Sequence, residues 1–380
     1  MGIKYDDYKE LIKRLNIEIV NPQTNFWMIR TKKGFFYEEF INEGFVALGW
    51  NIITQNEILN IVSTNDKGEI KAEREKLKKE IEKKYPRNKQ ASQIINKCIR
   101  FVDEMKTGDI IMIPSAGNDE ISFCTAGEYY EDSDCTYENE IEVIDRIDSK
   151  KDYGIGIKCP YKKRRKITVL KRIDGERLNI NLYKVLASYH GISRIDKHSE
   201  FILSSIYNIY YRNNIISMVF NVEQKGPIDT LELSGFMYNA SKLMKTMDDN
   251  IGISTKVNLN SAGDLILAIQ QFTNTTVGLL GSYHVLIGIL GVWIGVAGGK
   301  VGPVEFPSIV KIIMEIREHK SKLKVGEMNM ELQQIQIEKE RINLQRYYDE
   351  ITSSATNLEI NRDAVQNVID IRDYHHENND

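Results

Sequence analysis

The sequence predicts an α+β protein of several domains, and three features support this prediction. The first half of the chain holds short aromatic and β-branched runs broken by glycine, a pattern typical of strands. A glycine-rich apolar segment follows later, and after it a long charged segment with the features of a helix. With 380 residues, the chain has room for two or three hydrophobic cores. We expect domains at residues 1–210, 211–272, 273–302 and 303–380.

The first domain is expected to be a small, mostly closed β-barrel with an inserted helix. Its first runs, NFWMIR, KKGFFYEEF and GFVALGW, predict short strands with one helical turn between them. Four more strands are expected at GDIIMIP, EISFCTAGEYY, NEIEVIDRI and RKITVLKRI. The inserted helix is expected over about residues 70–105, with a break at Pro86, because proline removes a helical hydrogen bond.

A small α+β unit is expected over residues 211–272. IISMVFNVEQ predicts a strand, LELSGFMYNASKLMKTM a helix, and GISTKVNLN a second strand. The unit offers polar side chains for contact with a ligand, among them Lys256 and Asn258. An ordinary surface role is the alternative for these residues.

Residues 277–299, VGLLGSYHVLIGILGVWIGVAGG, contain no Asp, Glu, Lys or Arg. A helix of about 23 residues is about 34 Å long, enough to cross a hydrocarbon core of about 30 Å. Glycine stripes let helices approach closely, and an ionisable residue in a span usually faces a bundle interior. We therefore expect a self-associating transmembrane helix with these pore-facing residues: Gly281, His284, Gly288, Gly291 and Gly295. A buried or oligomerising helix of a soluble protein is the alternative.

The C-terminal region is expected to be a multimerising helix from about Glu305 to Ile351. One apolar stripe holds Met328, Leu332, Ile335 and Ile342, and a nearly opposite one holds Leu323, Met330, Ile337, Leu344 and Ile351. An apolar stripe on each side implies a neighbour on each side. We expect a homo-oligomer of more than two subunits.

The net charge is only −3, from 51 basic and 54 acidic side chains, so nucleic-acid binding has to be argued from local clusters. One cluster joins cations, which neutralise phosphates, to an aromatic ring on which a base can stack. It consists of Lys162, Lys163, Arg164, Arg165 and Lys166, next to Tyr161; of these, Tyr161, Lys162, Lys163, Arg164 and Arg165 are the expected contacts. Binding and a plain surface role both stay open for it. A second basic cluster, on the inserted helix, is interleaved with glutamates, which favours a solvated face.

Three phrases near the N-terminus carry a resemblance to a known family. W-x-I-R at Trp27–Arg30, Gly34-Phe35-Phe36, and V-A-L-G-W at Val46–Trp50 resemble the opening of a PUA-like or EVE-like domain of Mrr-type restriction proteins. GDIIMIP, Gly127-Glu128-Tyr129, YKKRRKITVLKRI and LYKVLASYHGISRI follow in the same order, so the resemblance covers about residues 25–207. It implies an aromatic-walled pocket for a base or small nucleotide, bordered by Trp27, Arg30, Phe36 and Trp50. Ordinary barrel core is the alternative for the two tryptophans.

Catalytic motifs are missing from the sequence. It contains no P-loop, no G-x-S-x-G and no H-E-x-x-H. Glu223-Gln224-Lys225 alone is similar to the Glu-x-Lys of restriction nucleases, without a convincing partner aspartate. The four cysteines form no C-x-x-C pair, which indicates reduced thiols. We expect no enzyme activity, no cofactor and no metal.

The order of the parts resembles membrane channel effectors of bacterial anti-phage defence, of the Hailong type. The resemblance implies an inner-membrane protein whose cytoplasmic sensor binds a nucleic acid, an oligonucleotide or a nucleotide signal. Binding would gate an oligomeric ion channel that kills the host cell, and a nucleotidyltransferase is a possible partner. The alternative is a soluble modified-DNA reader subunit of a restriction system, with residues 277–351 used for assembly with a nuclease.

Overall fold

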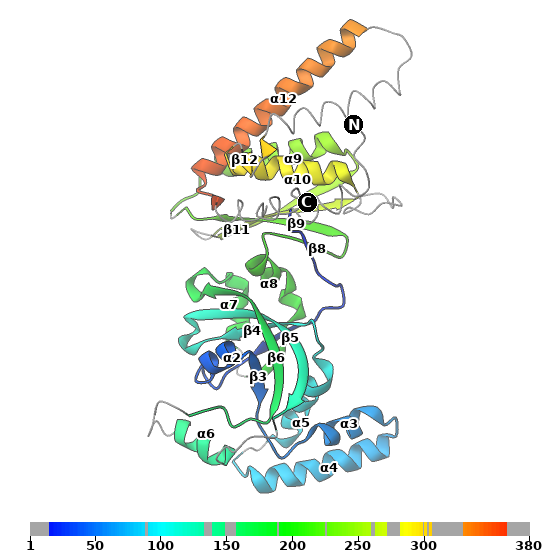
Figure 1. Ribbon diagram of the computed structural model, residues 1–380, viewed down its shortest axis with the longest axis vertical. Coiled ribbons are helices and arrows are strands. Elements are labelled where there is room, and N and C mark those ends of the chain that lie inside the picture. The colour runs from blue at the N-terminus through cyan, green and yellow to red at the C-terminus, as the bar shows by residue number, and fades with distance from the viewer. Residues whose placement is uncertain are drawn as a thin grey trace, which may run out of the picture. The chain divides into compact units, whose positions relative to one another are not determined.

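The computed structural model describes residues 15–87, 90–132, 139–148, 157–187, 190–224, 226–259, 263–271, 282–298, 300–301, 304–305 and 330–362. The chain divides into two compact units, here called the barrel unit, Gln23–Ile206, and the helix–sheet unit, Met1–Pro22 with Tyr207–Asp380 (Figure 1). The barrel unit covers the expected first domain, residues 1–210, except for residues 1–22 and 207–210, which belong to the helix–sheet unit. Residues 211–380, expected as three domains, belong to this one compact unit.

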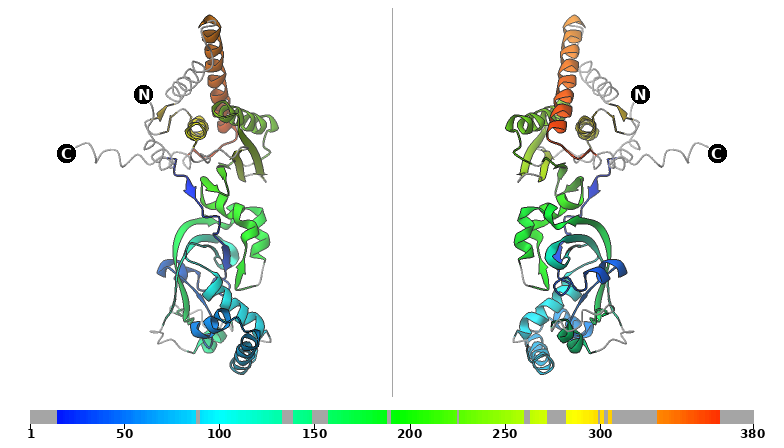
Figure 2. Two further views of the ribbon diagram at one scale, coloured as in Figure 1. Left: turned by 90° about the vertical axis from the view of Figure 1, so that its right-hand side faces the viewer. Right: turned by 90° about the vertical axis from the view of Figure 1, so that its left-hand side faces the viewer.

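A strongly curled six-stranded sheet forms the barrel unit, as a half-barrel (Figure 2). Its strand order is β3-β6-β5-β4-β2-β7. The strands are β2 (Phe26–Ile29), β3 (Phe45–Leu48), β4 (Ile110–Pro114), β5 (Glu120–Glu131), β6 (Lys163–Asp174) and β7 (Ile192–Arg194). Register shifts between Phe123 and Cys124, and between Ala126 and Tyr129, interrupt the long β5–β6 pair. Such bulges bend a strand and increase its twist, which favours the curl.

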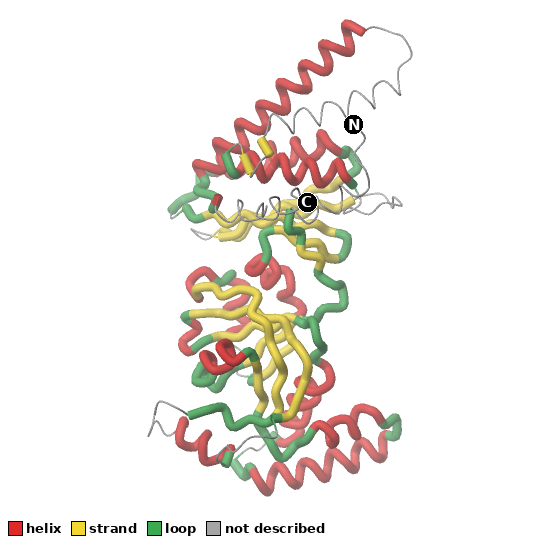
Figure 3. Tube along the Cα trace, viewed as in Figure 1, coloured by secondary structure: helices red, strands yellow, loops and turns green. Residues whose placement is uncertain are grey.

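Seven helices are described in the barrel unit (Figure 3). They are α2 (Tyr37–Glu43), α3 (Gln55–Ser63), α4 (Lys67–Lys84), α5 (Ala91–Ile99), α6 (Glu140–Asp148), α7 (Ile180–Leu186) and α8 (Ser199–Ile206). The break expected at Pro86 is confirmed, since α4 ends at Lys84 and the next helix begins at Ala91. That helix continues into a π-helical turn, Arg100–Glu104.

The strand expected at NEIEVIDRI is wrong, because this segment forms α6. Its apolar residues alternate in part with polar ones, which resembles a strand. Val143 and Ile147 are nevertheless the two that are buried, and they lie four residues apart on one helical face. The burial of this face decides the secondary structure.

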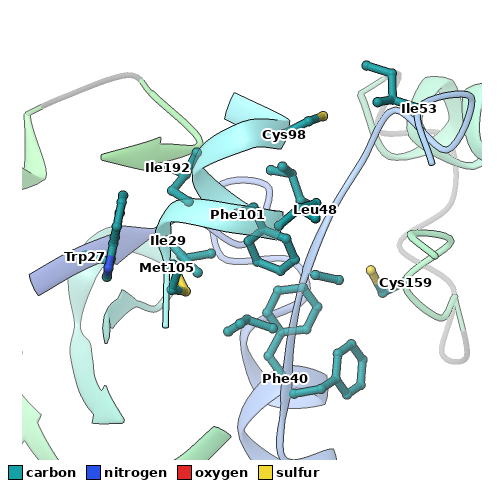
Figure 4. Packing of buried hydrophobic residues seen from close by; sticks show 14 of the residues in the cluster. Trp27, Ile29, Phe40, Leu48, Ile53, Cys98, Phe101, Met105, Cys159 and Ile192 are labelled. Atoms are coloured by element: carbon teal, nitrogen blue, oxygen red, sulfur yellow. The ribbon is translucent and has the colours of Figure 1, made fainter. Parts of the chain in front are cut away.

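The carboxylate of Asp109 links the start of β2 to the turn before β4 by hydrogen bonds, and only 3% of this residue is exposed. It accepts hydrogen bonds from the backbone amides of Asn25 (3.0 Å) and Lys106 (2.9 Å) and from the indole of Trp27 (2.8 Å). Trp27 therefore lies in the packed interior between these elements (Figure 4).

The helix–sheet unit places three helices with a five-stranded sheet of order β1-β8-β9-β11-β10. The strands are β1 (Glu18–Ile19), β8 (Ile209–Arg212), β9 (Ile215–Val222), β10 (Ile251–Leu259) and β11 (Gly263–Gln271). In addition, β12 (Lys300–Val301) pairs antiparallel with β13 (Val304–Glu305). The helices are α9 (Thr230–Met247), α10 (Tyr283–Val296) and α12 (Met330–Asn357). The expected β9, α9 and β10 are confirmed, and β11 is an additional strand.

The apolar helix α10 is packed inside this unit. Trp293 lies 5.0 Å from Phe220 of β9, measured between ring centroids. Gly288 lies against α9, where an added Cβ would be 2.8 Å from the sulfur of Met244. Gly295 lies against α12, where a Cβ would be 2.7 Å from Ile351. The glycine face thus packs closely against helices of the same chain, whereas the sequence led us to expect a face that associates with other subunits.

Within the described residues, no helix is both long and apolar enough to cross a membrane. Of the other expected pore-facing residues, Gly291 is buried, His284 is half-buried, and Gly281 lies outside the described residues. The membrane span expected over residues 273–302 therefore stays a prediction.

One apolar stripe of α12 is buried and the other is exposed. Leu344 and Ile351 are 1% and 0% exposed and pack into the core of the unit. Ile335 and Ile342, seven residues apart on the other stripe, are 52% and 59% exposed. Leu323 and Met328 lie outside the described residues. The stripe with Leu344 and Ile351 packs against other elements of the same chain, whereas Ile335 and Ile342 of the other stripe face solvent.

Close packing at Gly295 predicts a strong position-dependence of glycine substitutions. Gly295→Ala should destabilise the protein by about 1 to 3 kcal/mol, because the new methyl group overlaps Ile351. Gly235→Ala in α9 is the control, since its Cβ would meet Ser354 at an ordinary 3.5 Å. The control should be neutral or stabilising by about 0.5 to 1 kcal/mol, because alanine favours a helix. Chemical denaturation measures both, and equal unfolding midpoints would contradict the packing of α10.

Candidate functional site

Of the four residues expected to border a pocket, two are fully buried. Trp27 and Phe36 are both 0% exposed. The ring of Phe36 packs against Phe40 and Tyr161, with centroid distances of 6.1 and 5.8 Å. Trp27 therefore has the barrel-core role that was its alternative, and Phe36 is buried in the same core. Arg30 donates a hydrogen bond to the carbonyl of Leu186, before β7.

Three of the predicted phosphate-contacting cations are buried as well. Lys163, Arg164 and Arg165, at the start of β6, are 1%, 5% and 3% exposed. The expectation that these three contact nucleic acid is thus corrected by their burial. Their neighbour Lys162 is exposed.

Each buried cation binds backbone carbonyl groups, and most of these belong to turns or helix ends. Lys163 Nζ donates to the carbonyls of Trp50 (2.7 Å) and Ile53 (2.8 Å). Arg165 donates to the carbonyls of Gly127 and Met105, both at 2.8 Å. Burial lowers the pKa of both side chains from their ordinary values. Carbonyl acceptors offset the cost of burying such charges.

Arg164 adds an ion pair to these carbonyl bonds. Its guanidinium lies 3.0 Å from the carboxylate of Asp132 and donates to the carbonyl of Cys159 at 3.2 Å. It also lies 4.2 Å from the centroid of the Phe45 ring. These contacts join β6 to β3 and to the end of β5.

The turn after β3 holds Trp50 in a left-handed backbone conformation, with φ of +62°. This conformation is uncommon for a bulky residue and costs about 1 to 3 kcal/mol. Glu140 of α6 offsets that cost, since its carboxylate accepts from the amides of Trp50 (2.6 Å) and Asn51 (3.0 Å). The same carboxylate accepts from the Tyr85 hydroxyl at 2.8 Å, and burial raises the pKa of that phenol.

Gly49 allows the carboxylate of Glu140 to come this close. A Cβ at position 49 would be 2.9 Å from Glu140 Oε1 and 2.9 Å from the Tyr161 ring. Trp50 itself is half-buried, and the Lys97 ammonium lies 5.4 Å from its ring centroid. Such a distance is that of a cation–π contact. The turn therefore presents an aromatic residue that is fixed from several sides.

A pocket of about 290 Å³ adjoins this turn, between the start of α3, the end of β5 and the start of β6. It is lined by Asn51, Ile53, Thr54, Glu131, Asp132, Lys162 and Lys163. The Asn51 amide is engaged at both ends, since it donates to the Pro160 carbonyl (2.7 Å) and accepts from the Lys162 amide (2.9 Å). The pocket wall is therefore held by hydrogen bonds without a ligand.

Sequence reasoning found Trp50, Lys162 and Lys163 but missed the carboxylates beside them. Glu131 and Glu140 come from segments about 80 and 90 residues along the chain, and no local pattern links them to Trp50. The only polar neighbour of Trp50 that the sequence itself offers is Asn51, and it does not indicate which carboxylates lie nearby.

The predicted contacts Lys256 and Asn258 belong to the helix–sheet unit. Lys256 lies exposed on β10. Asn258 pairs with Asp264 through the backbone, and its side chain lies outside the described residues. Across the described ranges, no group of three His, Cys, Asp or Glu side chains is arranged to hold a metal ion.

The sequence matches no family model, and no similar chain was found among curated proteins or solved structures. Function is therefore argued from the chemistry of the site.

Loss of the Glu140 carboxylate should loosen the Trp50 turn. Glu140→Ala leaves two amides and a phenol without their acceptor, and each such loss costs about 1 to 3 kcal/mol where the group is buried. We expect lower thermal stability and faster hydrogen exchange at residues 49–53. Glu142→Ala, on an exposed position of the same helix, is the control and should change neither. Unchanged exchange in Glu140→Ala would show that the carboxylate does not hold the turn.

Proposed function

We propose that the barrel unit recognises a nucleic acid or nucleotide signal through the pocket beside Trp50. The observation that carries the proposal is a half-buried tryptophan in a strained turn, fixed by Glu140 and Lys163, next to a preformed polar pocket. Strained backbone that the surrounding structure holds in place is concentrated at binding sites. The resemblance to PUA-like and EVE-like readers supports the same assignment.

The size of the pocket favours a single nucleotide unit as the bound group. Small-molecule sites occupy about 300 to 1,000 Å³, and this pocket, at about 290 Å³, lies at the lower limit. A base that enters such a pocket has to leave its stack, which is easiest in a single strand, a mismatch or a free nucleotide. We therefore propose a single-stranded or extruded base as the ligand.

Charge indicates how the nucleotide would lie. The carboxylates of Glu131 and Asp132 line the pocket and repel phosphate, whereas Lys162 is an exposed cation that also lines it. The nearby cations Lys163 and Arg164 are engaged by carbonyls and by Asp132. We propose that the base occupies the pocket and that Lys162 contacts its phosphate.

The proposal includes two possible outputs of the helix–sheet unit, a membrane pore or assembly with a partner. The packing of α10 against Phe220, Met244 and Ile351 favours assembly with a partner over a membrane pore, because other parts of the chain already cover α10. A role in anti-phage defence rests on the resemblance in the order of the parts. Homo-oligomerisation and a nuclease or nucleotidyltransferase partner belong to this proposal as well.

Single-stranded oligonucleotides test the binding proposal with the full-length protein. Lys162→Ala should weaken binding about 3- to 10-fold and lower its salt dependence, since one phosphate contact is lost. Lys166→Ala is the matched control, because Lys166 is an exposed lysine four residues further along the chain, on β6, that does not line the pocket. Trp50→Ala should weaken binding further. Fluorescence anisotropy at two salt concentrations measures all three, and equal affinities of the Lys162 and Lys166 variants would contradict the assigned site.

Oligomerisation is proposed to use the exposed stripe of α12. Replacing Ile335 and Ile342 together with glutamate should shift the protein to a smaller species, because charges cannot be buried between apolar helices. Ile180→Glu is the control, since Ile180 is 54% exposed on α7 of the other unit. Sedimentation velocity of the full chain gives the result. An unchanged sedimentation coefficient in the α12 variant would rule out this stripe.

A further inference from the structure

The two carboxylate oxygens of Glu131 differ in their hydrogen bonds to the protein. Its Oε1 accepts from the backbone amide of Gln55 at 2.8 Å and from the Tyr129 hydroxyl at 3.0 Å. Its Oε2 has no hydrogen-bond partner within the part of the chain that the structure describes. Glu131 is exposed at the end of β5, and the two bonds to Oε1 orient its carboxyl group, so Oε2 is an oriented acceptor in the lining of the pocket.

The remaining pocket groups do not duplicate this acceptor. Both ends of the Asn51 amide are bonded to backbone, and the Thr54 hydroxyl caps α3 together with Glu57. Asp132 is held by Arg164. Selectivity at this wall therefore depends mainly on Glu131.

We infer that the pocket selects a base that carries an exocyclic amino group, with that group donating to Glu131. The inference rests on the proposed function, since it names the base class for the same site. Carboxylates accept from the N4 amino group of cytosine, and adenine carries an amino donor at N6. Thymine has a carbonyl oxygen, O4, where cytosine has its amino group, and two acceptors repel. Cytosine and adenine are thus favoured over thymine and uracil.

The test compares four oligonucleotides of equal length, two whose bases carry an amino donor and two whose bases do not. Full-length protein is titrated with oligo-dC, oligo-dA, oligo-dT and an oligo-dC whose bases are N4,N4-dimethylcytosine, which has no amino hydrogen. We expect oligo-dC and oligo-dA to bind at least about 10-fold tighter than the other two. The length and phosphate number are the same in all four, so phosphate contacts cancel in the comparison.

Glu131→Gln supplies the decisive variant. The amide keeps an oxygen for Gln55 and Tyr129 but places an N–H₂ donor where Oε2 was. The variant should lose the preference for oligo-dC and bind oligo-dT at least as well. Glu128→Gln, an exposed position of the same strand with the same change in charge, is the control and should keep the wild-type preference.

The outcomes separate this inference from the proposed function. Equal binding of all four oligonucleotides, still weakened by Lys162→Ala, would overturn the base preference and leave the reader function in place. Failure to bind any oligonucleotide or free nucleotide would overturn both. A preference that Glu131→Gln leaves unchanged would assign the selectivity to another residue and overturn the role of Glu131.

Discussion

The barrel unit depends on cations buried at the start of β6. A buried charge is costly unless hydrogen bonds surround it, and carbonyls of irregular segments need donors in turn. Lys163 and Arg165 meet both needs at once, because they donate to the carbonyls of the Trp50 turn and of the segment that ends at Met105. One strand thereby fastens two segments that are distant in the sequence. The long, flexible side chains act here as internal cross-links.

The shape of the pocket depends on the hydrogen bonds that hold the Trp50 turn. Lys163 holds the carbonyl of Trp50, and Glu140 holds its amide, so the peptide groups on both sides of a strained residue are fixed. Without these bonds, the left-handed conformation would relax at a gain of about 1 to 3 kcal/mol. Lys162 precedes the first buried cation and stays exposed. The two neighbouring lysines therefore differ in role: the Lys163 side chain is buried and holds the turn, whereas the Lys162 side chain is exposed and lines the pocket.

The sequence predicted the elements whose hydrophobic pattern is local. The runs that became β2 to β6, β9, β10 and α9 were found, as was the break at Pro86. The exception, α6, has a partly alternating pattern whose meaning depends on which face the fold buries. The basic cluster was misjudged because a run of cations looks the same whether it faces solvent or buried carbonyls. Glu131 and Glu140 could not be assigned, since only the folded chain brings them to Trp50.

Close helix packing at the glycines of α10 was predicted, but not its partners. A stripe of glycine shows that another backbone comes near without showing whose backbone it is. The fold supplies α9 at Gly288 and α12 at Gly295, and Thr352 of α12 donates to the Gly295 carbonyl at 2.9 Å. An uncharged helix can be covered by lipid or by protein, and in this unit protein covers it.

This coverage constrains any membrane output. For α10 to enter a bilayer, it would have to separate from the sheet, α9 and α12, and the apolar side chains it now covers would lose their partners. Exposing apolar surface costs about 25 cal/mol per Å², and a ligand can offset that cost only by the difference in its affinity for the two states. A pore would therefore need large, state-dependent binding energy from the barrel unit. Assembly through the exposed stripe of α12 leaves the core of the unit intact.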